Sequence, residues 1–271
     1  MLRKVIEEAL LEARRILFEA LSKGLVEVQG RGKFGDYSRQ FDMLTEKAIL
    51  NVLRRRLGNV FIISEELGFV PCERPDYYVL VDPVDGSTNA SRGIPFFASS
   101  IVIAESPDLE NVLAAGVIEH STGKLYLGDK ENGVTINGSP PSLSRTNSLK
   151  ESLVLVELAS LKKESENSIN PRSWCTRIIT KAKHARFLAA ASLEIAYILE
   201  GKADAFACVS RDLKIMDFCA SISLLKWAGG EYLIIGSDGK ISLTDSRRFG
   251  VIASSTNALL REIYSLRFEK E

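Results

Sequence analysis

The segment that most constrains the fold of this chain reads YYVLVDPVDGSTN and runs from Tyr77 to Asn89. It begins with aromatic and β-branched residues, the pattern of a buried strand, and it ends with Asp82 and Asp85 three positions apart. A strand end partly removes both carboxylates from water, and the stiff turn at Pro83 keeps them close together. The two carboxylates therefore repel each other unless the fold supplies a positive charge between them.

Two kinds of positive charge could satisfy this pair, a basic side chain or a hard cation. No Lys or Arg lies between Pro75 and Ser91, which favours a divalent metal. Carboxylates, the backbone carbonyl of Val84 and water would form the all-oxygen shell that Mg²⁺ prefers. Zinc is disfavoured because the chain has only His120 and His184 and its cysteines are scattered. An ordinary loop stays open as an alternative, since Asp-Pro and Asp-Gly are common turn formers.

The residues after Asp85 suit a phosphate group. Gly86 leaves room beside the backbone, Ser87 and Thr88 offer hydroxyls, and a short helix beginning here would direct N–H groups at an anion. A metal and a phosphate at one place indicate metal-assisted phosphoryl chemistry. The spacing is D-x-x-D and not the D-x-D of phosphatases that form an aspartyl-phosphate, so we expect water to be the nucleophile. A Walker A loop, a G-x-G-x-x-G fingerprint and a G-x-S-x-G serine motif are absent from the sequence.

The hydrophobic pattern predicts an α/β protein with two lobes that meet near Arg145. The first lobe, residues 1–145, is expected to place two amphipathic helices against a largely antiparallel sheet and to carry most of the metal ligands. The second lobe, residues 146–271, alternates strands and helices as an α/β layer. The predicted helices cover residues 1–21, 45–57, a stretch from about 171, a stretch ending near Gly201, 217–227 and the C-terminus. The predicted strands cover 59–64, 77–82, 96–105, 114–120, 124–128, 133–138, 152–159, 183–188, 204–210, 230–236 and 250–255.

Charge and cysteine content limit the classes of partner. The 271 residues carry 35 basic and 35 acidic side chains, so no global field favours nucleic acid or an anionic membrane. No segment is long and apolar enough to span a bilayer. The four cysteines form no C-x-x-C pair and indicate reduced thiols in a cytoplasmic protein. We therefore expect a small phosphate ester as the partner molecule.

Three motifs together resemble a known family. S-E-E at Ser64–Glu66, D-P-V-D-G-S-T-N at Asp82–Asn89 and M-D-F-C-A-S at Met216–Ser221 resemble, in order and separation, the three signatures of the inositol monophosphatase family. That family includes archaeal-type fructose-1,6-bisphosphatases, bisphosphate nucleotidases and NADP phosphatases. The stretches GVTING, EGKADAF and WAGGE also look like family landmarks, so the resemblance covers nearly the whole chain.

The resemblance implies a layered αβαβα fold, up to three Mg²⁺ ions with Mn²⁺ as a substitute, and hydrolysis by an activated water without a covalent intermediate. It also implies a homodimer. The implied metal ligands are Glu65, Asp82, the Val84 carbonyl, Asp85 and Asp217. The implied catalytic groups are Asp42, Glu65 and Ser87, with Asp42 and Ser87 orienting the water, and Gly86, Ser87 and Ala189 contact the substrate. A helix N-cap is the alternative role for Asp42.

Some positions depart from the family pattern. Met216 stands where the family commonly has Trp, and Cys219 interrupts the usual run of small residues. By the same resemblance, Cys208 stands where inositol-selective members have a glutamate that binds ring hydroxyls. Arg211 and Lys214 precede Asp217, and we expect them to hold a second phosphate, although a solvated turn is equally open.

These features favour fructose-1,6-bisphosphate, inositol-1-phosphate or both as substrate. A 3'(2'),5'-bisphosphate nucleotidase and an NADP phosphatase are the alternatives within the family. A catalytically silent relative that binds metal or phosphate is the alternative from another class. The loop from Arg31 to Arg39 resembles the mobile catalytic loop of the family, with a plain surface hairpin as its alternative.

Overall fold

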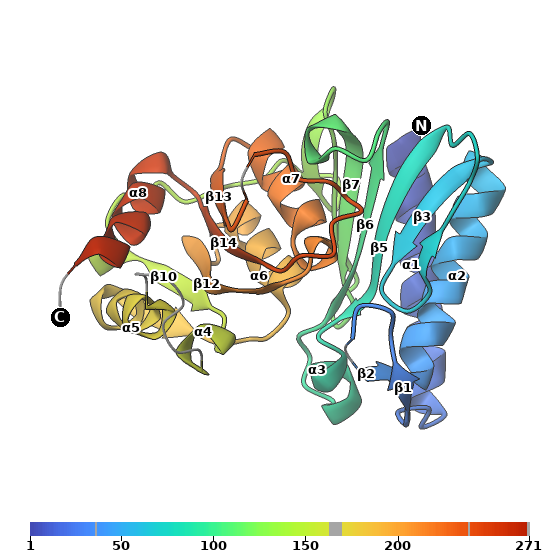
Figure 1. Ribbon diagram of the computed structural model, residues 1–271, viewed down its shortest axis with the longest axis horizontal. Helices are drawn as coiled ribbons and strands as arrows, with labels where there is room; N and C mark the ends of the chain where they lie inside the picture. Colours follow the sequence, from blue (N-terminus) through green and yellow to red (C-terminus); the bar gives the residue numbers. More distant parts are fainter. Residues whose placement is uncertain (36, 163–169, 238, 270–271) are drawn as a thin grey trace.

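The two larger β-sheets alternate with three layers of helices in the described part of the chain (Figure 1). The computed structural model describes residues 1–35, 37–162, 170–237 and 239–269. From the N-terminal side the layers are α1 with α2, a seven-stranded sheet, α6 with α7, a five-stranded sheet, and α5 with α8. The fold is therefore the αβαβα arrangement expected from the resemblance.

The seven-stranded sheet has the order β4-β3-β5-β6-β7-β8-β9. Its β3 and β5 pair in parallel and its other neighbours pair antiparallel, which confirms the predicted largely antiparallel sheet. The strands are β3 (Val60–Ser64), β4 (Gly68–Val70), β5 (Tyr77–Asp85), β6 (Ala98–Ala104), β7 (Val112–Glu119), β8 (Lys124–Asp129) and β9 (Gly133–Ile136). Because β3 and β5 are parallel, the acidic residues that follow or end them lie at one edge of the sheet.

Helices α1 (Leu2–Ser22) and α2 (Gln40–Leu57) cover the outer face of this sheet. Their apolar stripes pack against alternate residues of the strands, such as Ile101 and Ile103 of β6. Helix α2 begins five residues before the predicted start at Thr45. The reason is local, because the Asp42 carboxylate accepts a hydrogen bond from the Arg39 N–H at 2.9 Å and stabilises the first turn.

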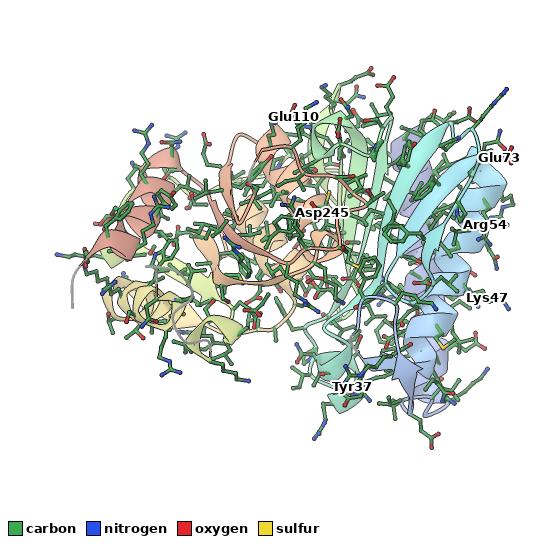
Figure 2. All side chains as sticks on the ribbon, viewed as in Figure 1. Tyr37, Lys47, Arg54, Glu73, Glu110 and Asp245 are labelled. Carbon is green, nitrogen blue, oxygen red and sulfur yellow. The ribbon has the colours of Figure 1, made fainter. Side chains whose placement is uncertain are left out.

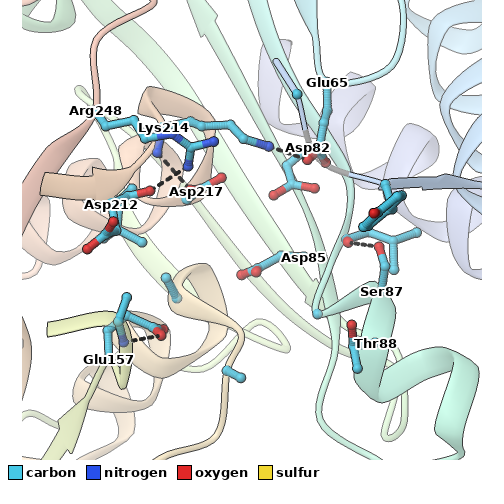
Figure 3. Close-up of a pocket in the computed structure, with 18 of the residues that line it drawn as sticks. Glu65, Asp82, Asp85, Ser87, Thr88, Glu157, Asp212, Lys214, Asp217 and Arg248 are labelled. Atoms are coloured by element: carbon cyan, nitrogen blue, oxygen red, sulfur yellow. Dashed lines mark hydrogen bonds and ion pairs between the residues drawn. The ribbon is translucent and has the colours of Figure 1, made fainter. Parts of the chain in front are cut away.

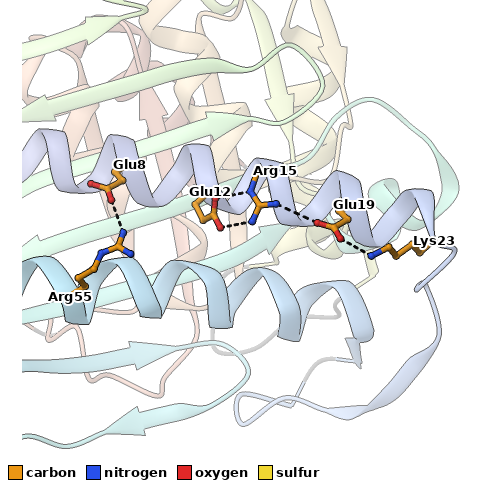
Figure 4. Close-up of polar contacts among 6 residues, drawn as sticks. All are labelled: Glu8, Glu12, Arg15, Glu19, Lys23 and Arg55. Atoms are coloured by element: carbon orange, nitrogen blue, oxygen red, sulfur yellow. Dashed lines mark hydrogen bonds and ion pairs between the residues drawn. The ribbon is translucent and has the colours of Figure 1, made fainter.

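The solvent side of α1 and α2 carries a row of ion pairs (Figure 4). Arg15 lies between Glu12 and Glu19 along α1, and Glu8 reaches Arg55 of α2 with a contact of 2.7 Å. Exposed pairs of this kind contribute about 0–1 kcal/mol each, so the buried apolar face provides most of the attachment of these helices.

The five-stranded sheet has the order β11-β10-β12-β14-β13. Its strands are β10 (Leu153–Val156), β11 (His184–Arg186), β12 (Ala205–Leu213), β13 (Glu231–Ile235) and β14 (Phe249–Ser254). Helices α5 (Pro171–Lys181) and α8 (Asn257–Ser265) pack on one face, and α6 (Ala191–Ala196) and α7 (Cys219–Trp227) lie between the two sheets. A further short helix, α4, covers Ala159–Lys162.

The structure corrects the sequence prediction between β12 and α7. Strand β12 continues to Leu213, three residues beyond the predicted end, and its register against β14 shifts between Cys208 and Leu213. Arg211 therefore belongs to the strand and not to a turn. Asp217 ends a 3-10 turn that begins at Ile215, and α7 begins only at Cys219.

The two sheets share one hydrophobic cluster. Val117 and Tyr126 of the first sheet and Leu155 and Phe206 of the second belong to the same group of buried side chains around α6 and α7. The predicted boundary near Arg145 falls in the connection between β9 and β10. A division into two domains stays a prediction. Within the described residues, the helices include none with the length and apolar character needed to cross a membrane.

Candidate active site

A cavity of about 630 Å³ opens at the edge where β3 and β5 end (Figure 3). The first sheet and its connections contribute one wall, and the segment after β12 contributes the facing wall. Nine of the predicted site residues line this cavity, namely Glu65, Asp82, Val84, Asp85, Gly86, Ser87, Ala189, Lys214 and Asp217. Asp42 does not line it but is hydrogen-bonded to Ser87.

The end of β5 has an irregular backbone that exposes its polar groups to the cavity. The register against β6 shifts between Asp82 and Asp85, where Pro83 cannot donate a ladder hydrogen bond. The freed Pro83 carbonyl instead accepts a hydrogen bond from the Ser99 hydroxyl at 2.5 Å. This bulge places Asp82, Val84 and Asp85 together among the residues that line the cavity.

Asp82 is one of the buried acidic residues that keep a side-chain oxygen without a hydrogen-bond partner. Its side chain is 2% exposed, and its Oδ1 atom has no hydrogen-bond partner. Burial raises the pKa of Asp82 well above its usual value, and the charges of Glu65 and Asp85 raise it further. A buried carboxylate oxygen without a partner is costly, so this position fits a cation that the carboxylate would bind.

The other acidic groups are each held through one oxygen. Asp85 Oδ2 accepts hydrogen bonds from the Ser192 N–H at 2.7 Å and from the Ser192 hydroxyl at 2.5 Å. Asp217 Oδ2 accepts a hydrogen bond from the Lys214 N–H at 2.7 Å. Burial raises the pKa of Asp85 to about 6, and the hydrogen bonds from Ser192 oppose this increase. Burial raises the pKa of Asp217 to about 7, and the charge of Lys214 opposes it.

A basic side chain does reach this acidic cluster, contrary to the sequence argument that favoured a metal alone. Lys214 Nζ lies 2.5 Å from Glu65 Oε1, although the two residues are 149 positions apart in the chain. Within the residues that the structure describes, no three Asp, Glu, His or Cys side chains are grouped as a ready-made metal site. The donors are nevertheless all oxygen atoms, and Asp82 Oδ1 still lacks a partner, so the residues fit a hard cation such as Mg²⁺.

The turn after Asp85 has the geometry expected for a glycine. Gly86 has φ 86°, and a Cβ there would lie 3.1 Å from the Phe96 carbonyl oxygen and 3.2 Å from Ala190 Cβ. Both the dihedral angle and the space exclude a side chain. Helix α3 (Ser87–Arg92) begins directly after Gly86, as predicted from the sequence.

The Ser87 hydroxyl joins this turn to α2. Ser87 Oγ lies 2.9 Å from Asp42 Oδ1 and 2.8 Å from the Val84 carbonyl oxygen. The structure thus brings together the pair that the resemblance implied, and Arg39 rather than Asp42 occupies the N-cap position of α2. Burial raises the pKa of Asp42 to about 8. Because one hydroxyl has one proton, it can donate to only one of these two oxygens at a time.

Sequence reasoning missed several residues around the cavity. Glu157 follows strand β10 and was detectable by the rule that acids gather at strand ends, whereas Arg248 precedes β14 without any local signal. Arg248 Nη1 donates to the Asp212 carbonyl at 2.6 Å. Arg211, which we expected to face a second phosphate, is exposed outside the cavity lining and lies against Gly236.

The loop that carries Ala189 has a strained backbone, and both backbone polar groups of the neighbouring Leu188 are hydrogen-bonded. Ala189 has φ 60°, which is uncommon for a residue other than glycine. Asn89 Nδ2 donates to the Leu188 carbonyl at 2.7 Å, and the Leu188 N–H donates to the buried Glu194 Oε1 at 3.1 Å. Neither Asn89 nor Glu194 was predicted as part of the site.

Strands β1 (Val28–Arg31) and β2 (Tyr37–Arg39) pair antiparallel beside the cavity. Arg31, Tyr37 and Arg39 line the cavity, and the side chain of Tyr37, labelled in Figure 2, is exposed. The antiparallel pairing of β1 and β2 agrees with the surface hairpin that was the alternative prediction for this stretch. Movement of the stretch as a catalytic loop stays a prediction.

Comparisons with known proteins agree with this architecture. A model of the inositol monophosphatase family matches residues 1–269. A fructose-1,6-bisphosphatase/inositol-1-monophosphatase of Methanothermobacter thermautotrophicus is 32% identical over 214 residues, 75% of this chain and 73% of that protein. A bifunctional NADP phosphatase/NAD kinase of Methanococcus maripaludis is 27% identical over 223 residues, 75% of this chain and 38% of that protein. The solved structure of extragenic suppressor protein SuhB from Bartonella henselae has a TM-score of 0.82 at 22% identity and covers 99% of this chain and 98% of that chain.

Proposed function

The chain belongs to the inositol monophosphatase family, and on this premise we propose that it is a Mg²⁺-dependent phosphatase of sugar or inositol phosphates. The family is one of phosphatases, and metal dependence is general in it. The ions, their number of up to three, and the roles of individual residues belong to the proposal.

One observation carries the proposal most directly. Asp82 lies buried between Glu65, Asp85 and Asp217 at the cavity edge and keeps one oxygen without a partner. These four carboxylates and the Val84 carbonyl would hold the metal. When bound, Mg²⁺ would supply Lewis-acid chemistry, which lowers the pKa of a water molecule and offsets the charge of the phosphate.

The chain's own residues would position the attacking water and the ester. Ser87, which lines the cavity, forms a hydrogen-bonded pair with Asp42, and the Val84 carbonyl gives the hydroxyl a second acceptor. This arrangement supports a role for the pair in orienting the water and receiving its proton. Glu65, which also lines the cavity, is the further group that we assign to catalysis.

The phosphate would lie against the turn at Gly86. Gly86 and Ser87 both line the cavity, and helix α3 begins at Ser87, where its first N–H groups would face the phosphate. Ala189 lines the same cavity and would contact the substrate from the second sheet. Lys214 and Arg248 are the basic residues of the facing wall, and they replace our earlier pair of Arg211 and Lys214 as candidates for a second phosphate.

Relatives support fructose-1,6-bisphosphate and inositol-1-phosphate as the first substrates to test. The Methanothermobacter protein is named for both activities. An NADP phosphatase is the second candidate, because the Methanococcus relative carries that name for one of its two activities. A 3'(2'),5'-bisphosphate nucleotidase remains a weaker alternative. A cytoplasmic location and a homodimer remain predictions.

The test is a phosphate-release assay with fructose-1,6-bisphosphate, inositol-1-phosphate, NADP and 3'-phosphoadenosine 5'-phosphate. Each ester is assayed with Mg²⁺ and with excess chelator. We expect release that requires Mg²⁺ and that is fastest with fructose-1,6-bisphosphate or inositol-1-phosphate. Faster release from NADP would replace the substrate assignment. No release from any ester would favour a catalytically silent relative.

A further inference from the structure

The ammonium group of Lys214 lies inside the acidic cluster and not at its rim. The Lys214 side chain is 6% exposed, and its Nζ atom is 2.5 Å from Glu65 Oε1 (Figure 3). The N–H of the same residue donates to Asp217 Oδ2 at 2.7 Å. Lys214 therefore connects a proposed ligand from the first sheet with one from the second.

The charge of Lys214 acts on more than its direct partner. It lowers the pKa of Asp82 and of Asp217, against the larger increase that burial causes at both residues. A buried lysine would itself be costly without an opposite charge, and Glu65 provides that charge. The cluster and the lysine thus stabilise each other when no other cation is present.

A metal ion and this ammonium group compete for the same oxygen. Oxygen ligands lie about 2.0–2.1 Å from Mg²⁺, so an ion on Glu65 Oε1 would lie only a few ångströms from Nζ at its present position, and the two positive charges would repel each other. An ion on the other oxygen would share the single negative charge of Glu65 with the ammonium group, which is also unfavourable at low dielectric. Metal binding therefore favours a position of Lys214 away from Glu65.

We propose that Lys214 is an internal counter-ion that occupies Glu65 until a divalent metal displaces it, and that it thereby sets the metal concentration at which the site fills. The inference rests on the proposed function only in taking the four carboxylates as metal ligands. Lys214 is a positioning residue in this scheme. The displaced ammonium group stays within the cavity wall, where a substrate phosphate can become its next partner, so metal and substrate binding are coupled.

The experiment measures metal binding and not turnover. Calorimetric titration with Mg²⁺, and electron paramagnetic resonance of free Mn²⁺, are applied to the full chain and to three variants. Lys214→Met removes the competing charge, and Lys214→Arg keeps it. Lys124→Met is the matched control, because Lys124 also lies 2.5 Å from a partly buried glutamate, Glu200, but away from the cavity.

We expect Lys214→Met to bind Mg²⁺ at least about 10-fold more tightly than the natural chain, since one repulsive competitor is gone. Lys214→Arg and Lys124→Met should stay within about 3-fold of the natural chain. Unchanged or weaker metal binding by a folded Lys214→Met would overturn the inference. If that variant does not fold, Lys214→Gln provides the same comparison.

The result also separates this inference from the proposed function. Binding of Mg²⁺ by all variants with equal affinity would leave the metal site in place and reject the competition by Lys214. Absence of Mg²⁺ and Mn²⁺ binding in every variant would reject the metal site itself, and with it the inference.

Discussion

Asp85 illustrates how one carboxylate can be both anchored and available. Its Oδ2 atom accepts two hydrogen bonds from Ser192, which fix the plane of the group and leave its other oxygen to the cavity side. Ser192 is in turn held by the Ser221 hydroxyl, which donates to the Ser192 carbonyl at 2.5 Å. The orientation of this proposed ligand therefore depends on α6 and α7, the helices that lie between the two sheets.

We predict that Asp85→Asn lowers kcat at least roughly 100-fold while the fold persists, because the amide keeps the shape of the side chain but lacks its charge. Steady-state phosphate release and circular dichroism measure the two effects. Asp76→Asn is the matched control, since Asp76 is exposed and lies outside the cavity lining. Near-normal turnover of Asp85→Asn at saturating Mg²⁺ would remove Asp85 from the proposed ligands.

His120 gives a prediction for the pH dependence of stability. Its ring is fully buried, stacks on Phe97 at 5.7 Å, and has Nε2 2.7 Å from Ser99 Oγ. Burial lowers its pKa to about 3. Between pH 3 and the usual value of about 6.5, the unfolded chain binds a proton at His120 that the folded chain does not, so the free energy of unfolding falls as pH falls.

For this residue alone the loss is about 2 kcal/mol between pH 8 and pH 5. Urea unfolding of the natural chain and of His120→Gln is measured at both pH values. The difference between the two proteins isolates the contribution of His120, because the buried carboxylates titrate in both. The variant should lose less stability on acidification, whereas His184→Gln, at an exposed position, should behave like the natural chain. Parallel pH curves for the natural chain and His120→Gln would contradict the assignment.

At the level of elements, α3 connects the phosphate turn to the loop of the second sheet. Asn89 of α3 is buried and donates through Nδ2 to the carbonyls of Phe96 and Leu188. The neighbouring Ala189 has φ 60°, a conformation that costs of order 1–3 kcal/mol and persists only when its surroundings enforce it. Asn89 is one of the groups that enforce it.

We predict that Asn89→Ala destabilises the fold by about 1–3 kcal/mol, because two buried carbonyls lose their donor. Relaxation of the Ala189 loop should also raise KM more than it lowers kcat, since the loop contacts the substrate and not the reacting water in our proposal. Urea unfolding and steady-state kinetics test the two parts. Asn132→Ala, on an exposed turn, is the control. An unchanged KM would separate α3 from substrate binding.

Local patterns predicted the elements well, and long-range contacts account for what they missed. The apolar run before Asp82 and the glycine after Asp85 identified the site, because both signals lie within a few residues of the chemistry. The approach of Lys214 to Glu65 joins residues 149 positions apart, and no local pattern encodes it. Strand β12 continues past Arg211 to Leu213, which pairs with Phe249 of β14, and this long-range pairing is not encoded in the local pattern.

For the whole molecule, the cavity matters because both sheets contribute to it. Glu65, Asp82 and Asp85 come from the first sheet and its connections, and Asp217 comes from the turn after β12 of the second. Between the sheets, α6 and α7 pack in one continuous hydrophobic cluster. Buried like charges from both sides oppose this packing, so a cation at the cavity should stabilise the complete fold and not one lobe alone.

We therefore predict that Mg²⁺ raises the Tm of the full chain with increasing concentration. An ion that binds only the folded state adds about 2.7 kcal/mol at 100 times its Kd, which corresponds to roughly 5 °C for a chain of this size. Differential scanning calorimetry over a Mg²⁺ series, followed by excess chelator, should show a reversible shift. Na⁺ at equal ionic strength controls for screening, and Asp82→Asn should lose most of the Mg²⁺ effect because it neutralises the central carboxylate. An equal shift in Asp82→Asn would place the ion elsewhere on the molecule and separate the stability of the fold from this cavity.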